Sequence, residues 1–410
     1  MPLITKTMNL KKILYILLAV AVIAVIAFVL YQFAGGRLTG GTTTGTGQTG
    51  SLPAAGNQQF PSSGQSAATS TGAASATTSV KFGVVSDGPV LDYFVNNANV
   101  VTVVRPDGTI ESISNGATSS LSAATISNII TASFSYDGKK ILVSSLVGTT
   151  TQTSVFDIAS QKWTTLPDNM ENPVWSPTND EVAYLATDGY GSETLDTINA
   201  AAANPRPVTL TTLAMENMLL QWPMANTLIV SDRPSAFIAD SIWKFNIPSR
   251  TLSSVVFEKL GTESSWNASG SALIFFAGGN NSGGTLVLQD PAGNRNLLSF
   301  GTLPSKCVFA APTSQAATSS VSSVNSIYCA VPTDQSTFQV ARLPDEYDQK
   351  VYFTNDNFYG IDPSSGSLTN IFSVAEANQN IDATDLKIFN NILFFVNRYD
   401  QKLYAISLPQ

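Results

Sequence analysis

The chain of 410 residues contains no histidine and only two cysteines. The absence of histidine excludes Ser-His-Asp and Cys-His catalysis, and every zinc or haem site that needs an imidazole ligand. Two cysteines are too few for an iron–sulfur cluster or a cysteine-rich zinc site. We therefore expect no cofactor and no metal site, while catalysis by Asp, Glu and Tyr, as in glycosidases, stays open.

Basic residues are also scarce, since 21 Lys and Arg stand against 29 Asp and Glu, for a net charge of −8. Proteins that bind nucleic acid gain most of their affinity from Lys and Arg that neutralise phosphates, so nucleic acid is not an expected partner. Several acidic residues follow predicted strands, but no D-x-D-x-D-G loop accompanies them. Turn chemistry explains them more simply than calcium sites do.

Charged residues are missing from residues 13–31, an apolar run of 19 residues that Lys6, Lys11 and Lys12 precede. A run of this length can cross a bilayer core, and basic residues on its N-terminal side place that end in the cytoplasm. We predict a cytoplasmic N-terminus at 1–12, a transmembrane signal-anchor helix at 13–33 and a cell-membrane protein whose remainder is extracytoplasmic. A cleaved signal peptide is the alternative.

Large apolar side chains are scarce in residues 34–78, which consist mainly of Gly, Ser, Thr, Ala and Gln. Such a segment cannot bury enough surface to offset its ordering entropy, so we expect a disordered linker. A flexible coil of this length spans about 35 to 40 Å on average. The linker would tether a folded domain at residues 79–410 to the membrane.

That domain contains an aromatic residue at a nearly constant interval, and successive anchors are 41, 47, 44 and 43 residues apart at Phe134, Trp175, Trp222, Trp266 and Phe309. A period of about 40 to 50 residues is typical of β-propeller blades. With Phe94 and Phe389 the anchors predict seven blades. The long interval before Phe389 indicates one blade with insertions at 315–325 and 333–349, and eight blades is the alternative.

Each repeat has the same internal pattern, as in TASFSYDGKKILVS at 131–144, NPVWSPTNDEVAYLA at 172–186 and SSWNASGSALIFFA at 264–277. A short strand, a turn and a β-branched or aromatic strand predict a hairpin, and Gly138 and Gly270 suit positive φ in its turn. Further segments, such as 153–158 and 241–246, supply a third and then a fourth strand. The predicted fold is therefore all-β, a single propeller of four-stranded blades.

The last repeat shows only three strands before the chain ends. Residues 81–85 are predicted to supply the fourth strand, which would close the ring by pairing the two ends of the domain.

The turn-bearing segments resemble the TolB-like branch of WD40-like propeller repeats, whose signature is an aromatic residue followed by Ser-Pro-Asp-Gly-Lys. Residues 134–139, 175–180 and 266–270 carry the pattern, with Tyr136 in place of Pro and Thr178 in place of Asp. The C-terminal part, with KCVFA at 306–310 and DATDLKIF at 382–389, is similar to uncharacterised membrane-anchored propellers of candidate-phyla bacteria. These resemblances imply a fold and no activity.

The two cysteines, Cys307 and Cys329, fall on neighbouring strands of the predicted sixth blade. A disulfide is expected because facing residues of such strands lie within bonding range and an extracytoplasmic domain is oxidised. A redox-active pair is the alternative, but the spacing is not the C-x-x-C that tunes reactive thiols.

Loops between the second and third strands of the blades meet on one rim of a propeller and are rich here in Asp, Asn, Gly and Tyr. Such residues can present hydrogen-bonding groups to a partner, although they are also ordinary turn residues. The candidate binding residues are Asp188, Asp232, Arg233, Asn280, Asn281, Arg398 and Asp400.

These observations predict a membrane-anchored, extracytoplasmic propeller that binds an envelope protein or a glycan. Two alternatives stay open. A carbohydrate-active or other hydrolytic propeller would need Asp or Glu residues in a deep axial pocket, and Asp345, Glu346 and Tyr347 form one acidic and aromatic group of that kind. The other alternative is a structural component of envelope assembly.

Overall fold

The computed structural model describes residues 81–122, 125–187, 192–280, 282–310, 326–363 and 365–409. All of them belong to one compact unit, residues 76–410. The predicted transmembrane helix and linker lie outside the described residues, as do the whole insertion at 315–325 and the loop residues Asp188 and Asn281. Among the described helices, none is long and apolar enough to cross a bilayer.

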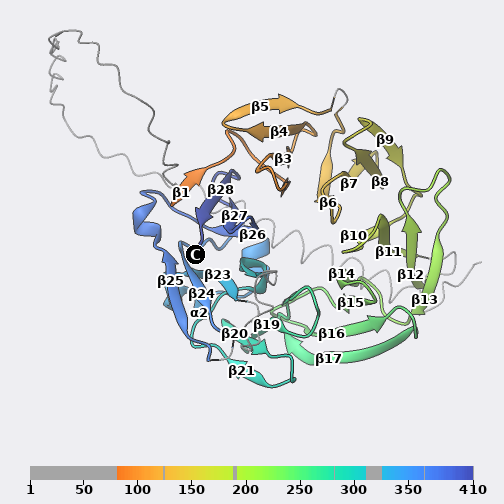
Figure 1. Ribbon diagram of the computed structural model, residues 1–410. Coiled ribbons are helices and arrows are strands. Elements are labelled where there is room, and N and C mark those ends of the chain that lie inside the picture. The colour runs from red at the N-terminus through yellow and green to blue at the C-terminus, as the bar shows by residue number, and fades with distance from the viewer. Residues whose placement is uncertain are drawn as a thin grey trace, which may run out of the picture. The chain divides into compact units, whose positions relative to one another are not determined.

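The described residues form 28 strands in seven antiparallel, four-stranded blades arranged around an axis (Figure 1). We call the strands of a blade A to D in chain order. The first three blades are β2 (Asp92–Val95), β3 (Val101–Val104), β4 (Ile110–Ser114) and β5 (Ala117–Ser120); β6 (Ile129–Phe134), β7 (Lys140–Val147), β8 (Thr150–Asp157) and β9 (Lys162–Thr165); and β10 (Glu171–Trp175), β11 (Glu181–Thr187), β12 (Glu193–Asn199) and β13 (Val208–Leu213).

Blades 4 and 5 share one residue pair, between Leu260 and Gly278. They consist of β14 (Leu219–Met224), β15 (Thr227–Ser231), β16 (Ala239–Asn246) and β17 (Thr251–Leu260), and of β18 (Ser264–Trp266), β19 (Leu273–Gly278), β20 (Gly284–Gln289) and β21 (Arg295–Leu297). Blade 6 consists of β22 (Cys307–Phe309), β23 (Ile327–Pro332), β24 (Asp356–Ile361) and β25 (Leu368–Phe372). The A strands of neighbouring blades contact one another and lie nearest the axis (Figure 1).

Blade 7 confirms the predicted closure of the ring. Its strands β26 (Ala383–Phe389), β27 (Ile392–Asn397) and β28 (Leu403–Ser407) are completed by β1 (Phe82–Val84), which pairs with β28. Phe82 faces Ile406 and Val84 faces Tyr404, so the chain enters β1 at the end of β28 that is far from the loop between β27 and β28. The domain therefore joins the preceding segment on the face opposite the loops between strands B and C.

Seven apolar clusters hold the blades together, one at each junction between neighbouring blades. Both faces of each sheet are covered, which is why second strands such as 273–276 read as unbroken apolar runs. The predicted anchors lie on A strands, and the Trp175 indole donates a hydrogen bond to the carbonyl of Ser133 in the preceding blade, at 3.0 Å. The aromatic residues thus recur at this interval because they lie on the A strands, which pack against one another in neighbouring blades.

Two predicted turn glycines have positive φ, with values of 69° at Gly138 and 64° at Gly270. A Cβ at Gly138 would lie 2.2 Å from the ring of Phe94 on the preceding blade, and one at Gly270 would lie 1.4 Å from the sulfur of Met224. Both the backbone conformation and the packing between blades therefore require glycine.

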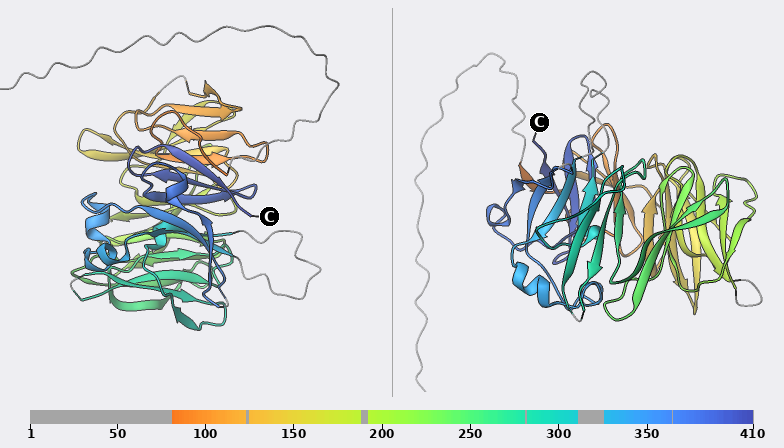
Figure 2. Two further views of the ribbon diagram at one scale, coloured as in Figure 1. Left: turned by 90° about the vertical axis from the view of Figure 1, so that its left-hand side faces the viewer. Right: turned by 90° about the horizontal axis from the view of Figure 1, so that it is seen from below.

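Blade 6 carries the predicted insertion at 333–349 between strands B and C, where it forms α2 (Gln335–Val340) and α3 (Asp345–Asp348) (Figure 2). Asp334 caps α2 by accepting hydrogen bonds from the backbone N–H groups of Ser336 and Thr337. Two 3-10 turns, η1 (Pro304–Lys306) and η3 (Val374–Glu376), precede β22 and follow β25. The described residues contain one blade in this interval, as seven blades require.

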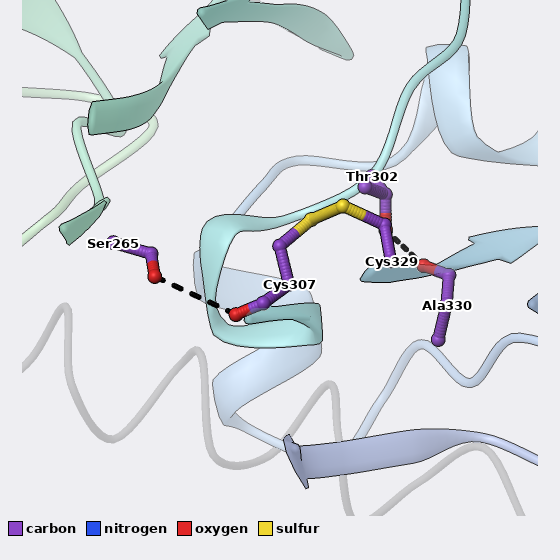
Figure 3. Close-up of a disulfide and its surroundings, with 5 residues drawn as sticks. All are labelled: Ser265, Thr302, Cys307, Cys329 and Ala330. Atoms are coloured by element: carbon purple, nitrogen blue, oxygen red, sulfur yellow. Dashed lines mark hydrogen bonds between the residues drawn. A yellow bond between two sulfur atoms is a disulfide. The ribbon is translucent and has the colours of Figure 1, made fainter. Parts of the chain in front are cut away.

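The predicted disulfide is present between Cys307 on β22 and Cys329 on β23, which face each other in the strand register (Figure 3). Both half-cystines are buried. Beside the bridge, the Thr302 hydroxyl donates a hydrogen bond to the carbonyl of Ala330 at 2.6 Å, which holds the chain before η1 against β23.

Candidate functional site

Two of the predicted rim residues, Asp232 and Asp400, are held by hydrogen bonds within their own blades. Asp232 accepts a hydrogen bond from the backbone N–H of Ser241, and Asp400 accepts from the Tyr404 hydroxyl at 2.6 Å. Arg233 and Asn280 are exposed. The loops do lie between strands B and C of their blades, as expected, but the structure gathers no group of side chains from Asp232, Arg233, Asn280 and Asp400.

Arg398, the remaining rim candidate, belongs to a buried group of ion pairs. We call this group the Lys306 cluster; it contains Lys306, Asp356, Asp382 and Arg398. The Lys306 ammonium lies 2.7 Å from a carboxylate oxygen of Asp356 and 2.5 Å from one of Asp382, and the Arg398 guanidinium lies 2.8 Å from the other oxygen of Asp382. Two cations face two anions, so the cluster is neutral.

The insertion of blade 6 completes the surroundings of this cluster. Arg398 donates to the carbonyl of Tyr347 on α3, and its guanidinium lies 3.6 Å from the centre of the Tyr347 ring. The neighbouring α3 residues are likewise bonded, because Asp345 accepts from the N–H of Ala236 in blade 4 and Glu346 accepts from the N–H of Arg342. The acidic and aromatic group noted in the sequence therefore fastens the insertion to the rim.

Electrostatics stabilise the charged forms of Lys306 and Asp382, whereas burial raises the pKa of Asp356. Burial alone would lower the pKa of Lys306, but Asp356, Tyr347 and Asp382 raise it above its ordinary range. Burial would also raise the pKa of Asp382, yet the attraction of Lys306 and Arg398 lowers it. These groups have a structural role: they join blade 6, blade 7 and the insertion.

A second group of charges lies at the axis, and it borders a cavity of about 480 Å³. The cavity is lined by the A strands of blades 1, 2 and 7, and by the turn that contains Tyr136. Its walls are aromatic at Phe94, Phe134 and Phe389, with Ser133 and Ser135 between them. We call this space the axial cavity.

The charged wall of the axial cavity consists of Lys387, Asp92 and Asp385, which we call the Lys387 cluster. The Lys387 ammonium contacts Asp92 Oδ1, lies 3.3 Å from Asp385 Oδ2, and donates to the carbonyl of Tyr93 at 3.2 Å. It also lies 4.4 Å from the centre of the Tyr93 ring. One cation therefore faces two carboxylates, and the surplus charge is negative.

Asp385 has an unusual backbone conformation. The pairing of β26 with β27 shifts register between Thr384 and Lys387, which places a bulge around Asp385, and its φ is 51°. The Tyr93 hydroxyl fixes this bulge by donating to the carbonyl of Asp385 at 2.6 Å. Positive φ costs free energy at a non-glycine residue, and such strain is concentrated at functional sites in proteins.

The Asp385 side chain is partly open to solvent, although one of its carboxylate oxygens, Oδ2, is buried. Its side chain is 34% exposed, although no described group donates a hydrogen bond to Oδ2. Burial raises the pKa of Asp385 to about 6, because the attraction of Lys387 offsets the burial only in part and Asp92 repels a second negative charge. Asp92, in contrast, accepts from the backbone N–H groups of Tyr93 and Phe134.

Asp385 also lines two further cavities along the axis. One, of about 320 Å³, lies toward the rim and is bordered by Tyr347, Asp348 and Arg398; the other, of about 380 Å³, is bordered by Trp222, Trp266 and Ser305. Ser305 in turn hydrogen-bonds to Glu263, where burial and the charge of Asp348 raise the pKa to about 8. Asp385 thus contributes to the lining of three cavities.

No sequence motif marked the Lys387 cluster. The segment 382–389 stood out only for its similarity to other chains, and Asp92 lies beside an anchor without a recognisable pattern. Among the residues that the structure describes, no group of three or more acidic or cysteine side chains is arranged to hold a metal ion. The arrangement offers hydrogen-bond acceptors, negative charge and aromatic walls.

No protein-family model matches the sequence, and no curated protein matches it. Among solved structures, the chain is similar to TolB from Acinetobacter baumannii, at 11% identity and a TM-score of 0.41, over 78% of this chain and 63% of that one. The β-propeller domain of the Trilobed protease from Pyrococcus furiosus is 11% identical, with a TM-score of 0.48 over 78% and 92% of the two chains.

A third similar structure is the Pyrococcus horikoshii acylaminoacyl peptidase, at 12% identity and a TM-score of 0.46, over 76% of this chain and 49% of the peptidase. The likenesses concern the fold alone.

Proposed function

We propose that this chain is a membrane-anchored, extracytoplasmic binding module whose ligand, an envelope protein or a glycan, enters the axial cavity. The observation that carries the proposal is the strained Asp385 carboxylate, which borders a cavity of about 480 Å³ with aromatic walls. A concave site with a few convergent polar groups is the usual form of a ligand site. The cavity replaces the rim loops as the binding surface.

The N-terminal sequence supports the location. The apolar run at 13–31 follows three lysines, and 45 residues at 34–78 link it to the propeller. The chain enters β1 on the face opposite the loops between strands B and C. A tether raises the local concentration of the module near membrane-bound partners. Protease added to intact cells should digest the linker and release the propeller, whereas protection of the linker would contradict the extracytoplasmic location.

Site-specific photo-crosslinking in intact membranes tests the site itself. The full-length protein would carry a photoreactive residue at Tyr136, which is 48% exposed beside the axial cavity, or at Arg233 on the rim. Leu297, which is 72% exposed on β21, serves as the matched control. Crosslinks to a defined protein or glycan from position 136 alone support the proposal. Crosslinks from position 233 alone would move the site to the rim.

A second candidate function is carboxylate-dependent hydrolysis, and the raised pKa values favour it. A carboxyl group with a pKa of about 8, as at Glu263, can donate a proton near neutral pH, while Asp385, with a pKa of about 6, is mostly ionised and can activate water. A screen of envelope glycans with the full chain would show product formation. Loss of the product with both Asp385→Asn and Glu263→Gln would favour the enzyme over the binding module.

A further inference from the structure

We propose that the axial cavity binds its ligand through an ammonium group, which docks on Asp385 between the aromatic walls. This inference rests on the proposed binding function and names the chemistry of the ligand. Two sources carry such a group in macromolecules, the side chain of lysine and a free amino terminus, and the experiment below separates them.

The hydrogen-bond donors of the Lys387 cluster already have partners within the protein. An ammonium has three N–H groups. Lys387 donates two of them, to Asp92 and to the carbonyl of Tyr93, and its ammonium forms an ion pair with Asp385 Oδ2 at 3.3 Å. Lys387 is therefore already paired with acceptors of the protein, which disfavours its use by an anionic ligand. Asp92 is also occupied, because it accepts from two backbone N–H groups as well as from Lys387.

The lining of the axial cavity carries more negative than positive charge. Lys387 is the only basic side chain among the residues that line the axial cavity, and it faces two carboxylates. With Asp385 ionised, the cavity has a net charge of −1. An anionic ligand such as a phosphate or a carboxylate would be repelled, whereas a cation would restore neutrality without competing for Lys387.

The remaining lining of the axial cavity is largely aromatic. Phe94, Phe134, Phe389 and Tyr136 line the same space as the Lys387 cluster, and aromatic faces attract cations. The propeller already uses this contact in the same place, since the Lys387 ammonium lies over the Tyr93 ring. A carboxylate facing aromatic rings favours an ammonium over a neutral hydroxyl group, which would gain the hydrogen bond but not the attraction to the rings.

The test is calorimetric titration of the full-length protein in detergent with five probes. These are N-acetyl-lysine methylamide, a lysine-free tripeptide amide with a free amino terminus, the fully acetylated forms of these two as matched controls, and a neutral trisaccharide. We expect at least one amine to bind and its acetylated form to bind at least tenfold more weakly. The amine that binds identifies the source.

Two variants place the binding in the axial cavity. Asp385→Asn should weaken the amine at least tenfold, and Phe134→Leu should weaken it about fivefold by removing one aromatic face. Asp107→Asn, which changes an exposed carboxylate in a loop of blade 1, serves as the control and should bind as the parent does. Circular dichroism and thermal melting would confirm that each variant is folded.

A pH series gives an independent readout. The charged and titratable groups around Asp385 are Asp92, Lys387 and Tyr93 on one side, and Asp348, Lys350, Arg398 and Tyr347 on the side of the rim. Because burial raises the pKa of Asp385 to about 6, amine binding should weaken as the pH falls from 7 to 5. Asp385→Asn should remove most of that dependence.

The outcomes separate the two proposals. Equal binding of free and acetylated probes, or unchanged binding by Asp385→Asn, would overturn the ammonium proposal. Binding of the trisaccharide alone, lost in Phe134→Leu, would overturn it while leaving the axial binding module standing. If no probe binds and position 136 gives no crosslink in membranes, both proposals fail.

Discussion

Two lysines in this propeller each lie between two aspartates, Lys306 where blade 6 meets blade 7 and Lys387 where blade 7 meets blade 1, and they differ in what surrounds them. Lys306 and its carboxylates are buried, and Arg398 brings the cluster to neutrality. Lys387 and its carboxylates border the axial cavity, and no second cation balances them. The first cluster is complete without a ligand, whereas the second retains a negative charge facing open space.

A group of ion pairs alone therefore does not indicate a binding site. Removing one partner from a buried pair leaves a charge without solvent or counterion, so such clusters mainly make the fold sensitive to mutation. In a cluster beside a cavity, water or a ligand can take the place of the missing partner. Arg398, a predicted rim binding residue, belongs to the buried Lys306 cluster, whereas Asp385 belongs to the Lys387 cluster beside the cavity.

The largest expected effect is on the Lys306 cluster. Lys306→Met should lower the free energy of unfolding by about 3–5 kcal/mol, because Asp356 and Asp382 lose a shared buried counterion. Urea unfolding would measure the change. Lys139→Met removes the ion pair of an exposed lysine with Asp137 and should leave the stability nearly unchanged. Equal effects in the two variants would contradict the structural role of the cluster.

The disulfide lies next to the same cluster, since Cys307 follows Lys306 directly. Replacing both Cys307 and Cys329 by serine should cost about 3 kcal/mol, because the bridge closes a loop across a sequence separation of 22 residues. Thermal melting with and without reductant should show the same loss in the parent protein. A parent melting temperature that does not respond to full reduction would argue against a stabilising bridge.

Glu263 differs from the carboxylates of both clusters, because no cation lowers its pKa. Its pKa is raised to about 8, so the neutral form favours folding at low pH, and that stability is lost as the pH rises through 8. Glu263→Gln should therefore reduce the fall in stability between pH 6.5 and 9 by about 2 kcal/mol. Asp385 and Asp240, both with a pKa of about 6, titrate mostly below this window. Parallel pH profiles for parent and variant would show the prediction to be wrong.

Lys387→Met should affect stability less than Lys306→Met, by about 1–2 kcal/mol, because solvent reaches Asp385 and its carboxylate can take up a proton. The pKa of Asp385 should rise further, since the attraction of Lys387 is lost. Urea unfolding at pH 5 and pH 8 would show the larger loss at pH 8. A loss as large as that of Lys306→Met would remove the distinction between the clusters.

The smallest effect is expected on the rim. Arg233→Ala together with Asn280→Ala should change stability by less than about 0.5 kcal/mol, because both side chains are exposed. Arg398→Ala should be clearly destabilising, since it leaves Asp382 with one fewer counterion. Thermal melting would compare the double variant with Arg398→Ala. Similar melting temperatures for both would indicate that Arg398 makes no stabilising contact and is a free rim residue.

Local signals in the sequence were sufficient for most of the fold. The spacing of the anchors, the glycines of the hairpin turns and the missing last strand predicted seven blades and the closure by β1, because each blade repeats the same packing on its neighbour. Cys307 and Cys329 were predicted to bond because they fall on adjacent strands of one blade.

The candidate site depended on the tertiary structure. Asp92 and Lys387 are separated by 295 positions, and only the closure of the ring brings blade 1 beside blade 7. The bulge at Asp385 is a register shift between β26 and β27, and a single Asp inside a predicted strand does not mark such a shift in the sequence. The repeat thus determined by itself how each blade is built, since that depends on neighbours in the chain, while the charge at the axis was decided by residues that meet only when the ring is complete.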